Sequence, residues 1–278
     1  MIDTHLYIVP PRLPGVGNLG PPLLQPPEQR VALLCREMRE AGIHAVLAMG
    51  SVGNVPDDPL GINATLTLAD LVPGLHPVGA MDPTQAHPDH LRRVEKVLAT
   101  GRVKALKGYL GYLHFPPDYA GYRPYYELAE RYKIPVVFHT GDTHTAYAKL
   151  RFAHPLLVDD VAVDHPNVNF VLAHFGNPWM LDAAEVVSKN LNVWTDLSGL
   201  VIGDASIFGD PAKREVIDEV KANLGKAFRY AERPNRFLFG SNWPLIPIAP
   251  YRAFIADAIP QVYHAQVFEE NAQRLFKI

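Results

Sequence analysis

Residues 168–176 of the chain read Val-Asn-Phe-Val-Leu-Ala-His-Phe-Gly, an apolar run that ends in a histidine and a glycine turn. Residues 135–141, Pro-Val-Val-Phe-His-Thr-Gly, have the same arrangement. Strands of a parallel sheet that is covered on both faces are apolar at consecutive positions rather than at alternate ones. Both segments are therefore predicted to be buried parallel strands.

Outward from these two segments, short apolar runs alternate with amphipathic helical stretches over the whole chain. Strands are predicted at residues 2–9, 44–49, 77–81, 103–110, 135–139, 168–174, 193–196 and 237–239. Helices are predicted at 28–41, 89–100, 124–132, 156–164, 180–189, 211–229, 251–259 and 267–276, with a short helix that Asn63 caps and that ends near residue 72.

This alternation predicts a parallel sheet with right-handed crossovers, and eight units can close into a barrel. The length of 278 residues is close to the roughly 250 residues of one such barrel. We therefore expect a single (β/α)₈ barrel domain over residues 1–278. An open doubly wound sheet is the alternative.

Composition restricts the classes of function. The net charge is −3 with acidic and basic residues mixed, so no nucleic-acid partner is expected. No apolar run approaches the roughly 20 residues of a membrane helix, and the first residues do not resemble a secretory signal. The single cysteine, Cys35, is interpreted as a core residue in a cytoplasmic, reducing setting. The expected partner is a small-molecule substrate, and a homodimer is left open.

Residues 15–20, Gly-Val-Gly-Asn-Leu-Gly, match a dinucleotide-binding fingerprint. In that fingerprint the last glycine opens a helix, whereas here Pro21 and Pro22 follow it and the next predicted helix begins near Glu28. The segment is therefore interpreted as part of a loop, residues 10–27, over the barrel mouth.

Histidines stand at three of the predicted strand ends, where a (β/α)₈ barrel places its catalytic residues. His139 and His174 each follow an apolar run, and His5 lies in the first strand, on one face with Asp3 and Tyr7. Three such imidazoles converge near the barrel axis, and imidazole is a good ligand for zinc and similar metals. The sequence thus predicts one site that contains all three.

Two longer motifs make the pattern more specific. Residues 174–179 read His-Phe-Gly-Asn-Pro-Trp, and residues 239–244 read Phe-Gly-Ser-Asn-Trp-Pro. With these motifs the chain resembles the amidohydrolase superfamily, in particular the branch of metal-dependent hydrolases related to aminocarboxymuconate-semialdehyde decarboxylase. The resemblance runs along the whole chain, through residues 2–7, 103–110, 135–143, 171–179, 195–200, 238–244 and 271–276.

The resemblance implies a divalent metal, with zinc as the first choice, on His5, His139 and His174. Tyr7 stands where the family has a second strand-one histidine, and Asn242 stands where it has an aspartate that binds metal and accepts a proton. A phenol of pKa near 10 is a poor ligand, and an amide cannot act as a base. Loss of a general base costs roughly 10²–10⁴ in rate, although three histidines and a water still make a zinc site.

Further candidates come from the same strand ends and motifs. Lys107, on the fourth strand, is predicted to join His174 and Asn242 as a catalytic residue, and Asp196 is interpreted as a helix cap. The predicted substrate-binding residues are Tyr7, His114, His144, Asn177, Trp179 and Trp243.

The expected function is that of a metal-dependent hydrolase of C–N or C–O bonds, or of a non-oxidative decarboxylase, acting on a small polar substrate at an altered metal site. One alternative is a catalytically silent barrel that binds a small ligand, as Tyr7 and Asn242 would allow. Another is a metal-independent hydrolase that uses a histidine as base. Metal content separates the first hypothesis from the other two.

Overall fold

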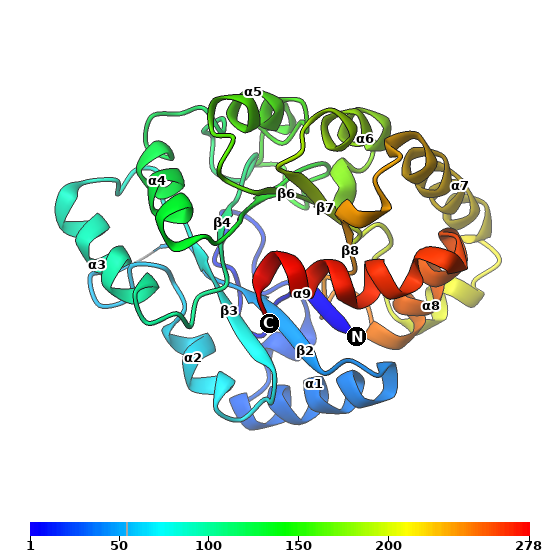
Figure 1. Ribbon diagram of the computed structural model, residues 1–278. Helices are drawn as coiled ribbons and strands as arrows, with labels where there is room; N and C mark the ends of the chain where they lie inside the picture. Colours follow the sequence, from blue (N-terminus) through cyan, green and yellow to red (C-terminus); the bar gives the residue numbers. More distant parts are fainter. Residues whose placement is uncertain (54) are drawn as a thin grey trace.

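The computed structural model describes residues 1–53 and 55–278, and in these residues eight parallel strands form one sheet in the order β1 to β8. The helices lie outside the strands (Figure 1). The strands are β1 (Ile2–Leu6), β2 (Ala45–Met49), β3 (Leu75–Ala80), β4 (Ala105–Gly108), β5 (Val136–His139), β6 (Phe170–Ala173), β7 (Val193–Asp196) and β8 (Phe237–Leu238). The helices are α1 (Pro27–Ala41), α2 (Asn63–Ala69), α3 (Pro88–Leu98), α4 (Arg123–Tyr132), α5 (Leu157–Asp164), α6 (Met180–Lys189), α7 (Arg214–Ala231), α8 (Ile248–Ala258) and α9 (Asn271–Phe276).

Backbone hydrogen bonds close the sheet between its first and last strands. The amide of Thr4 donates to the carbonyl of Phe239 at 2.9 Å, and the amide of Asn242 donates to the carbonyl of His5 at 2.8 Å. The predicted (β/α)₈ barrel is confirmed, and the open sheet is excluded. Every residue of β1, β2, β5, β6 and β7 is buried, as expected for strands covered on both faces.

Helix α2 begins differently from the prediction. Asn63 is its first residue rather than its cap, and Ile62 occupies the cap position. The carboxylate of Asp58 accepts hydrogen bonds from the amides of Ile62 at 2.8 Å and Asn63 at 3.1 Å. A side chain four residues before the cap thus satisfies the free amides at the helix start, a role that neighbouring sequence alone does not reveal.

The end of the chain also departs from the prediction of one helix over 267–276. A π-helical turn, Gln266–Glu270, precedes α9. The buried side chain of Asn271 donates to the carbonyls of Pro234 and Phe237. These hydrogen bonds hold the start of α9 next to the first residue of β8. Helix α9 contacts both β1 and β8 (Figure 1). In the described part of the chain, no helix has the length and apolar character needed to cross a membrane.

Candidate active site

Three buried histidines meet at the carboxyl ends of the strands. His5 lies in β1, His139 is the last residue of β5, and His174 directly follows β6. The centre of the His174 ring lies 4.8 Å from that of His5 and 4.9 Å from that of His139. The hydroxyl of Thr140 donates to the carbonyl of Ala173 at 2.6 Å and holds the ends of β5 and β6 together. Residues from three separate strands therefore form one cluster.

Asp196, the last residue of β7, connects this cluster. Its Oδ2 accepts a hydrogen bond from Nδ1 of His5 at 2.9 Å. Its Oδ1 accepts from the backbone amides of His174 and Ser198, both at 3.0 Å, and from the Ser198 hydroxyl at 2.5 Å. Burial alone would raise the pKa of Asp196, but the neighbouring His5, which donates a hydrogen bond to it, holds that pKa well below its ordinary value together with His174 and Lys107. The site thus contains a buried, ionised carboxylate.

Each histidine has one ring nitrogen fixed by an acceptor. The partner of His5 is Asp196, so its Nε2 is left, and this atom is buried without a hydrogen-bond partner. Nδ1 of His174 donates to the carbonyl of Ser198 at 3.0 Å, and Nε2 of His139 donates to the carbonyl of Asp142 at 2.9 Å. Because an acceptor fixes one nitrogen of each ring as the N–H, the other carries a lone pair.

Burial lowers the pKa of all three histidines. For His139 the second cause is the neighbouring His174, and for His5 it is Lys107. The imidazoles are therefore neutral near pH 7, which is the form that binds a metal or accepts a proton.

Lys107, on β4, lies fully buried near the cluster. Its Nζ has no hydrogen-bond partner among the described residues and lies 5.6 Å from the centre of the Tyr109 ring. Burial lowers the pKa of Lys107 to about 7, although Asp196 opposes the shift. The predicted catalytic lysine is thus close enough to act on the charges of the site, but it does not line the cavity described below.

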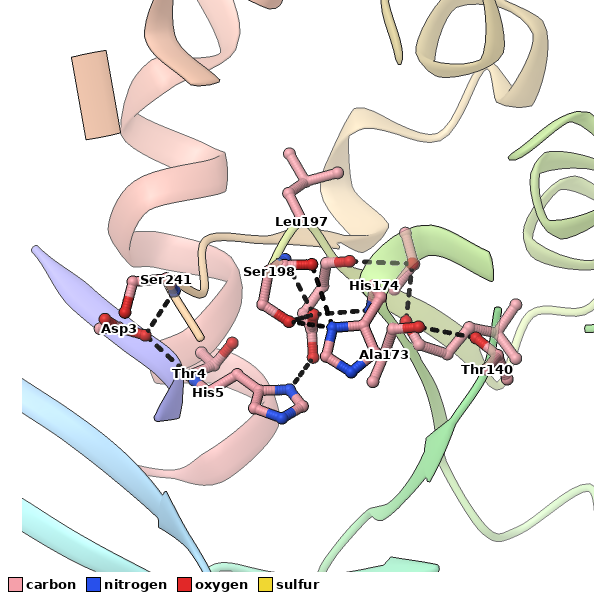
Figure 2. A network of polar contacts seen from close by, with 12 residues as sticks. Asp3, Thr4, His5, Thr140, Ala173, His174, Leu197, Ser198 and Ser241 are labelled. Atoms are coloured by element: carbon pink, nitrogen blue, oxygen red, sulfur yellow. Dashed lines mark hydrogen bonds and ion pairs between the residues drawn. The ribbon is translucent and has the colours of Figure 1, made fainter. Parts of the chain in front are cut away.

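Asp3 is a second buried carboxyl group beside the cluster. Its Oδ1 accepts hydrogen bonds from the amides of His5 at 3.1 Å and Ser241 at 3.0 Å (Figure 2). Burial raises the pKa of Asp3 to about 7. Asp3 therefore joins β1 to the segment after β8 and holds the backbone of His5 in place.

A cavity of about 130 Å³ opens beside His139 and His174, which line it, whereas His5 lies outside its lining. The loop of residues 10–27, predicted to cover the barrel mouth, forms one side of it. The lining residues are Tyr7, Pro11, Leu13, Val16, Leu19, Tyr112, His139, Asp142, His144, His174, Asn177, Gly199, Leu200, Ile202, Asn242 and Leu245.

The two positions that differ from the family pattern both face this cavity. The Tyr7 ring centre lies 5.7 Å from that of His5, and burial with the neighbouring Tyr109 raises the pKa of Tyr7 well above its ordinary value. Tyr7 is therefore a neutral phenol. The amide oxygen of Asn242 is buried without a hydrogen-bond partner among the described residues.

Gly199, three residues after β7, allows the Asn242 side chain to lie here. Its φ is +63°, and a Cβ at this position would lie 2.6 Å from Nδ2 of Asn242 and 3.2 Å from Nδ1 of His174. His174 and Asn242 themselves have φ of 62° and 69°. Left-handed backbone at residues other than glycine costs roughly 1–2 kcal/mol and concentrates at functional sites.

The remaining predicted substrate-binding residues divide into two groups. His144 and Asn177 line the cavity. His114, Trp179 and Trp243 lie outside its lining. His114 is exposed and donates to the carbonyl of Tyr147, Trp179 packs against His154, and Trp243 is buried and donates to Glu37. These contacts show that His114, Trp179 and Trp243 pack between loops and helices rather than against the cavity.

Three buried residues could together hold a divalent cation, and one of them, Asp196, was not predicted as a ligand from the sequence. Candidate ligand atoms of His5, His174 and Asp196 lie within 4.8 Å of one another. His139, which the resemblance implied as the third ligand, is outside this group, and its Nε2 is bound to Asp142. These three residues would hold the cation, and Asp196 would supply the compensating negative charge.

Asp196 is the functional residue that the sequence interpretation missed. A helix cap was expected, but Asp196 binds His5 and the backbone of His174 instead. Its position at the carboxyl end of the strand Val193–Asp196 was the available signal, because the carboxyl ends of all barrel strands meet at one face. Tyr112 and Asp142, which also line the cavity, come from loops that carry no comparable signal.

The chain thus forms a TIM barrel with a buried histidine–carboxylate cluster at the carboxyl ends of its strands, the face where enzymes of this fold place their active sites. The sequence matches the amidohydrolase family over residues 2–278, so the chain belongs to that family. Among curated proteins, none matches the sequence.

Solved structures share the fold at low sequence identity. An uncharacterised TIM-barrel protein from Bordetella bronchiseptica is 21% identical, with a TM-score of 0.69 over 100% of this chain and 98% of its own. A probable 2-pyrone-4,6-dicarboxylic acid hydrolase from Acinetobacter baumannii is 14% identical (TM-score 0.68; 100% and 99% covered). A 5-carboxyvanillate decarboxylase from Novosphingobium aromaticivorans, complexed with manganese, is 13% identical (TM-score 0.66; 100% and 96% covered).

Proposed function

We propose that this chain is a metal-dependent hydrolase that cleaves a C–O or C–N bond of a small polar substrate. The observation that carries the proposal is the buried cluster beneath the cavity, in which His5, His174 and the ionised Asp196 offer ligand atoms within 4.8 Å of one another. Zinc is the first choice of metal, because imidazole and carboxylate ligands suit it. Once bound, the metal would polarise a carbonyl or lower the pKa of a water.

The protein's own residues supply the other requirements of hydrolysis. Asp196 fixes the ring of His5 and sets its tautomer, so that Nε2 faces away from the carboxylate. His139 lines the cavity with its Nε2–H held by Asp142, which leaves the lone pair of Nδ1 to accept a proton. Asn242 cannot take that proton, so we assign the role of base to His139.

Decarboxylation is less well supported than hydrolysis. A decarboxylase must bind a carboxylate and then protonate a carbon. Among the described residues that line the cavity there is no lysine or arginine, and burial raises the pKa of the phenols Tyr7 and Tyr112, which makes them weak acids. We therefore place hydrolysis first.

We also propose that the protein works in the cytoplasm. Its single cysteine, the half-buried Cys35, cannot form an intrachain disulfide, which suits a reducing compartment.

A metal-independent hydrolase is the second candidate, and the His5–Asp196 pair favours it. A carboxylate hydrogen-bonded to Nδ1 of a buried imidazole orients that imidazole as a base without any metal. The fully buried Lys107 contributes to the lowered pKa of His5 and so acts on this pair.

One experiment tests both candidates. Protein purified without chelator is assayed on a panel of esters, lactones and amides, before and after metal removal, and its metal content is measured. Turnover that is lost on chelation and restored by zinc supports the metal-dependent hydrolase, whereas turnover that survives chelation supports the second candidate. Absence of turnover with and without added zinc would refute both and leave a ligand-binding barrel.

A further inference from the structure

A second hollow opens directly beside the cavity of the candidate active site. Its volume is about 500 Å³. Five side chains line both hollows, so the two are adjacent: Val16, Leu19, His144, Ile202 and Leu245. The outer hollow also contacts Asn18, Gly20, Pro21 and Leu24.

The two hollows differ in chemistry. The lining of the inner cavity includes the neutral imidazoles of His139 and His174 together with Tyr7, Tyr112 and Asn242, whereas most of the outer lining is apolar. Leu24 and Ile202 are 68% and 37% exposed, although both are large apolar residues. They come from the loop of residues 10–27 and from the segment after β7, two separate parts of the chain. Exposed apolar side chains gathered at the mouth of a cavity indicate a surface that a ligand covers.

The charge of the lining restricts that ligand further. Among the described residues of either hollow, no lysine or arginine contributes to the lining, and the inner cavity contains the carboxyl group of Asp142. Carboxylates are usually bound by charge-assisted hydrogen bonds from arginine or lysine. The lining therefore favours an uncharged ligand.

We infer that the outer hollow is a subsite for the apolar tail of an uncharged ester or lactone. The carbonyl of this substrate lies at the histidine cluster, and a tail of several carbon atoms leads outward between Leu19, Leu24 and Ile202. This inference rests on the proposed hydrolysis for the identity of the reacting group, whereas the apolar tail rests on the lining alone. A multiply charged aromatic acid would fit the pocket poorly.

Binding of a matched ligand series tests the subsite. Dissociation constants are measured by calorimetry for γ-lactones whose side chain lengthens from methyl to hexyl, on zinc-loaded and on metal-free protein. We expect each added methylene to tighten binding by about twofold to fourfold, as burial of a CH₂ group predicts. Affinity that does not depend on chain length would overturn the subsite, as would tighter binding of benzene-1,3-dicarboxylate than of the hexyl lactone.

Variants locate the effect. The double substitution Leu24→Asn and Ile202→Asn should flatten the dependence of affinity on chain length. The control Leu191→Asn replaces a leucine that is 67% exposed but lies outside both hollows, and it should keep the full dependence. An unchanged dependence in the double variant would show that the tail does not lie in this hollow.

The outcomes separate this inference from the proposed function. Chain-length-dependent binding without turnover would support the subsite and refute the hydrolase. Turnover of short lactones at a KM that does not change with tail length would support the hydrolase and refute the subsite.

Discussion

At the scale of single residues, Asp196 organises the site. Its two carboxylate oxygens bind the ring of His5, the backbone of His174 and both donors of Ser198. His174 has a left-handed backbone with φ of 62°, and its amide is one of the groups that Asp196 holds. The carboxylate thus determines both the direction of an imidazole and the shape of the turn after β6.

Replacing Asp196 by asparagine keeps its size but removes its charge, and the new NH₂ group faces donors that previously met an acceptor. We expect Asp196→Asn to destabilise the metal-free protein by about 3–5 kcal/mol, because a buried charge network loses one member. Zinc affinity should fall by at least roughly 10–100-fold. Urea unfolding and chelator competition measure the two effects. In the surface control Asp89→Asn, which loses an exposed pair with Arg92, each change should be small.

Tyr7→His combined with Asn242→Asp tests whether these positions face the metal site. Both side chains line the same cavity as His139 and His174, so the double variant would add an imidazole and a carboxylate to the ligand set. We expect tighter zinc binding at neutral pH, because the added carboxylate offsets the charge of the cation. Competition with a chromophoric chelator measures it. Equal affinities of wild type and double variant would show that residues 7 and 242 do not contribute ligands.

At the scale of elements, the strands were predictable and their ends were not. Consecutive apolar residues identified β5 and β6 because both faces of the sheet are covered. Residues 8 and 9 are apolar and buried, which led to a predicted strand over 2–9, yet the strand β1 ends at Leu6 because the residues beyond it form no ladder with β2. Burial sets the sequence pattern, whereas hydrogen-bond pairing sets the boundary.

In the candidate site, the positions at strand ends could be predicted from the sequence, whereas the contacts between distant residues could not. The three histidines could be predicted because each stands at a strand end. The hydrogen bond between Asp196 and His5 could not, since it joins positions 191 residues apart and depends on how the barrel closes. His114, Trp179 and Trp243 lie in or beside the expected motifs, but their side chains pack elsewhere.

The turn after β7 depends on Gly199, and a matched pair of variants isolates the reason. Gly199 and Gly17 have nearly equal φ of +63° and +67°, but a Cβ at Gly17 meets nothing within 4 Å. Gly17→Ala should therefore lose about 1–2 kcal/mol from backbone strain alone. Gly199→Ala should lose more and also weaken zinc binding, because its methyl group displaces Asn242. Equal losses of stability in the two variants, measured by urea unfolding, would contradict this explanation.

At the scale of the whole molecule, the buried Lys107 makes stability depend on pH. In the unfolded chain lysine keeps its proton up to about pH 10.5, whereas in the fold the pKa of Lys107 is about 7. Between these values the unfolded state binds more protons, so the free energy of unfolding should rise with pH, by a few kcal/mol at most. The window from pH 7.5 to 9.5 lies above the titration of histidine and below that of tyrosine.

Urea unfolding of metal-free protein at pH 7.5 and 9.5 measures this rise for wild type and Lys107→Met. The variant should lack most of it, because methionine has no proton to lose. A rise of the same size in both proteins would mean that the amine of Lys107 reaches solvent.

We propose that His5, His174 and Asp196 hold one divalent cation beneath the cavity. Calorimetric titration of zinc into metal-stripped protein tests it most directly, with His174→Ala as the ligand variant and the exposed His114→Ala as the control. We expect about one zinc per chain in wild type and control, and in His174→Ala a loss of zinc affinity larger than the roughly 10–100-fold that removal of an outer partner costs. No saturable zinc binding, or equal affinity in all three proteins, would contradict it.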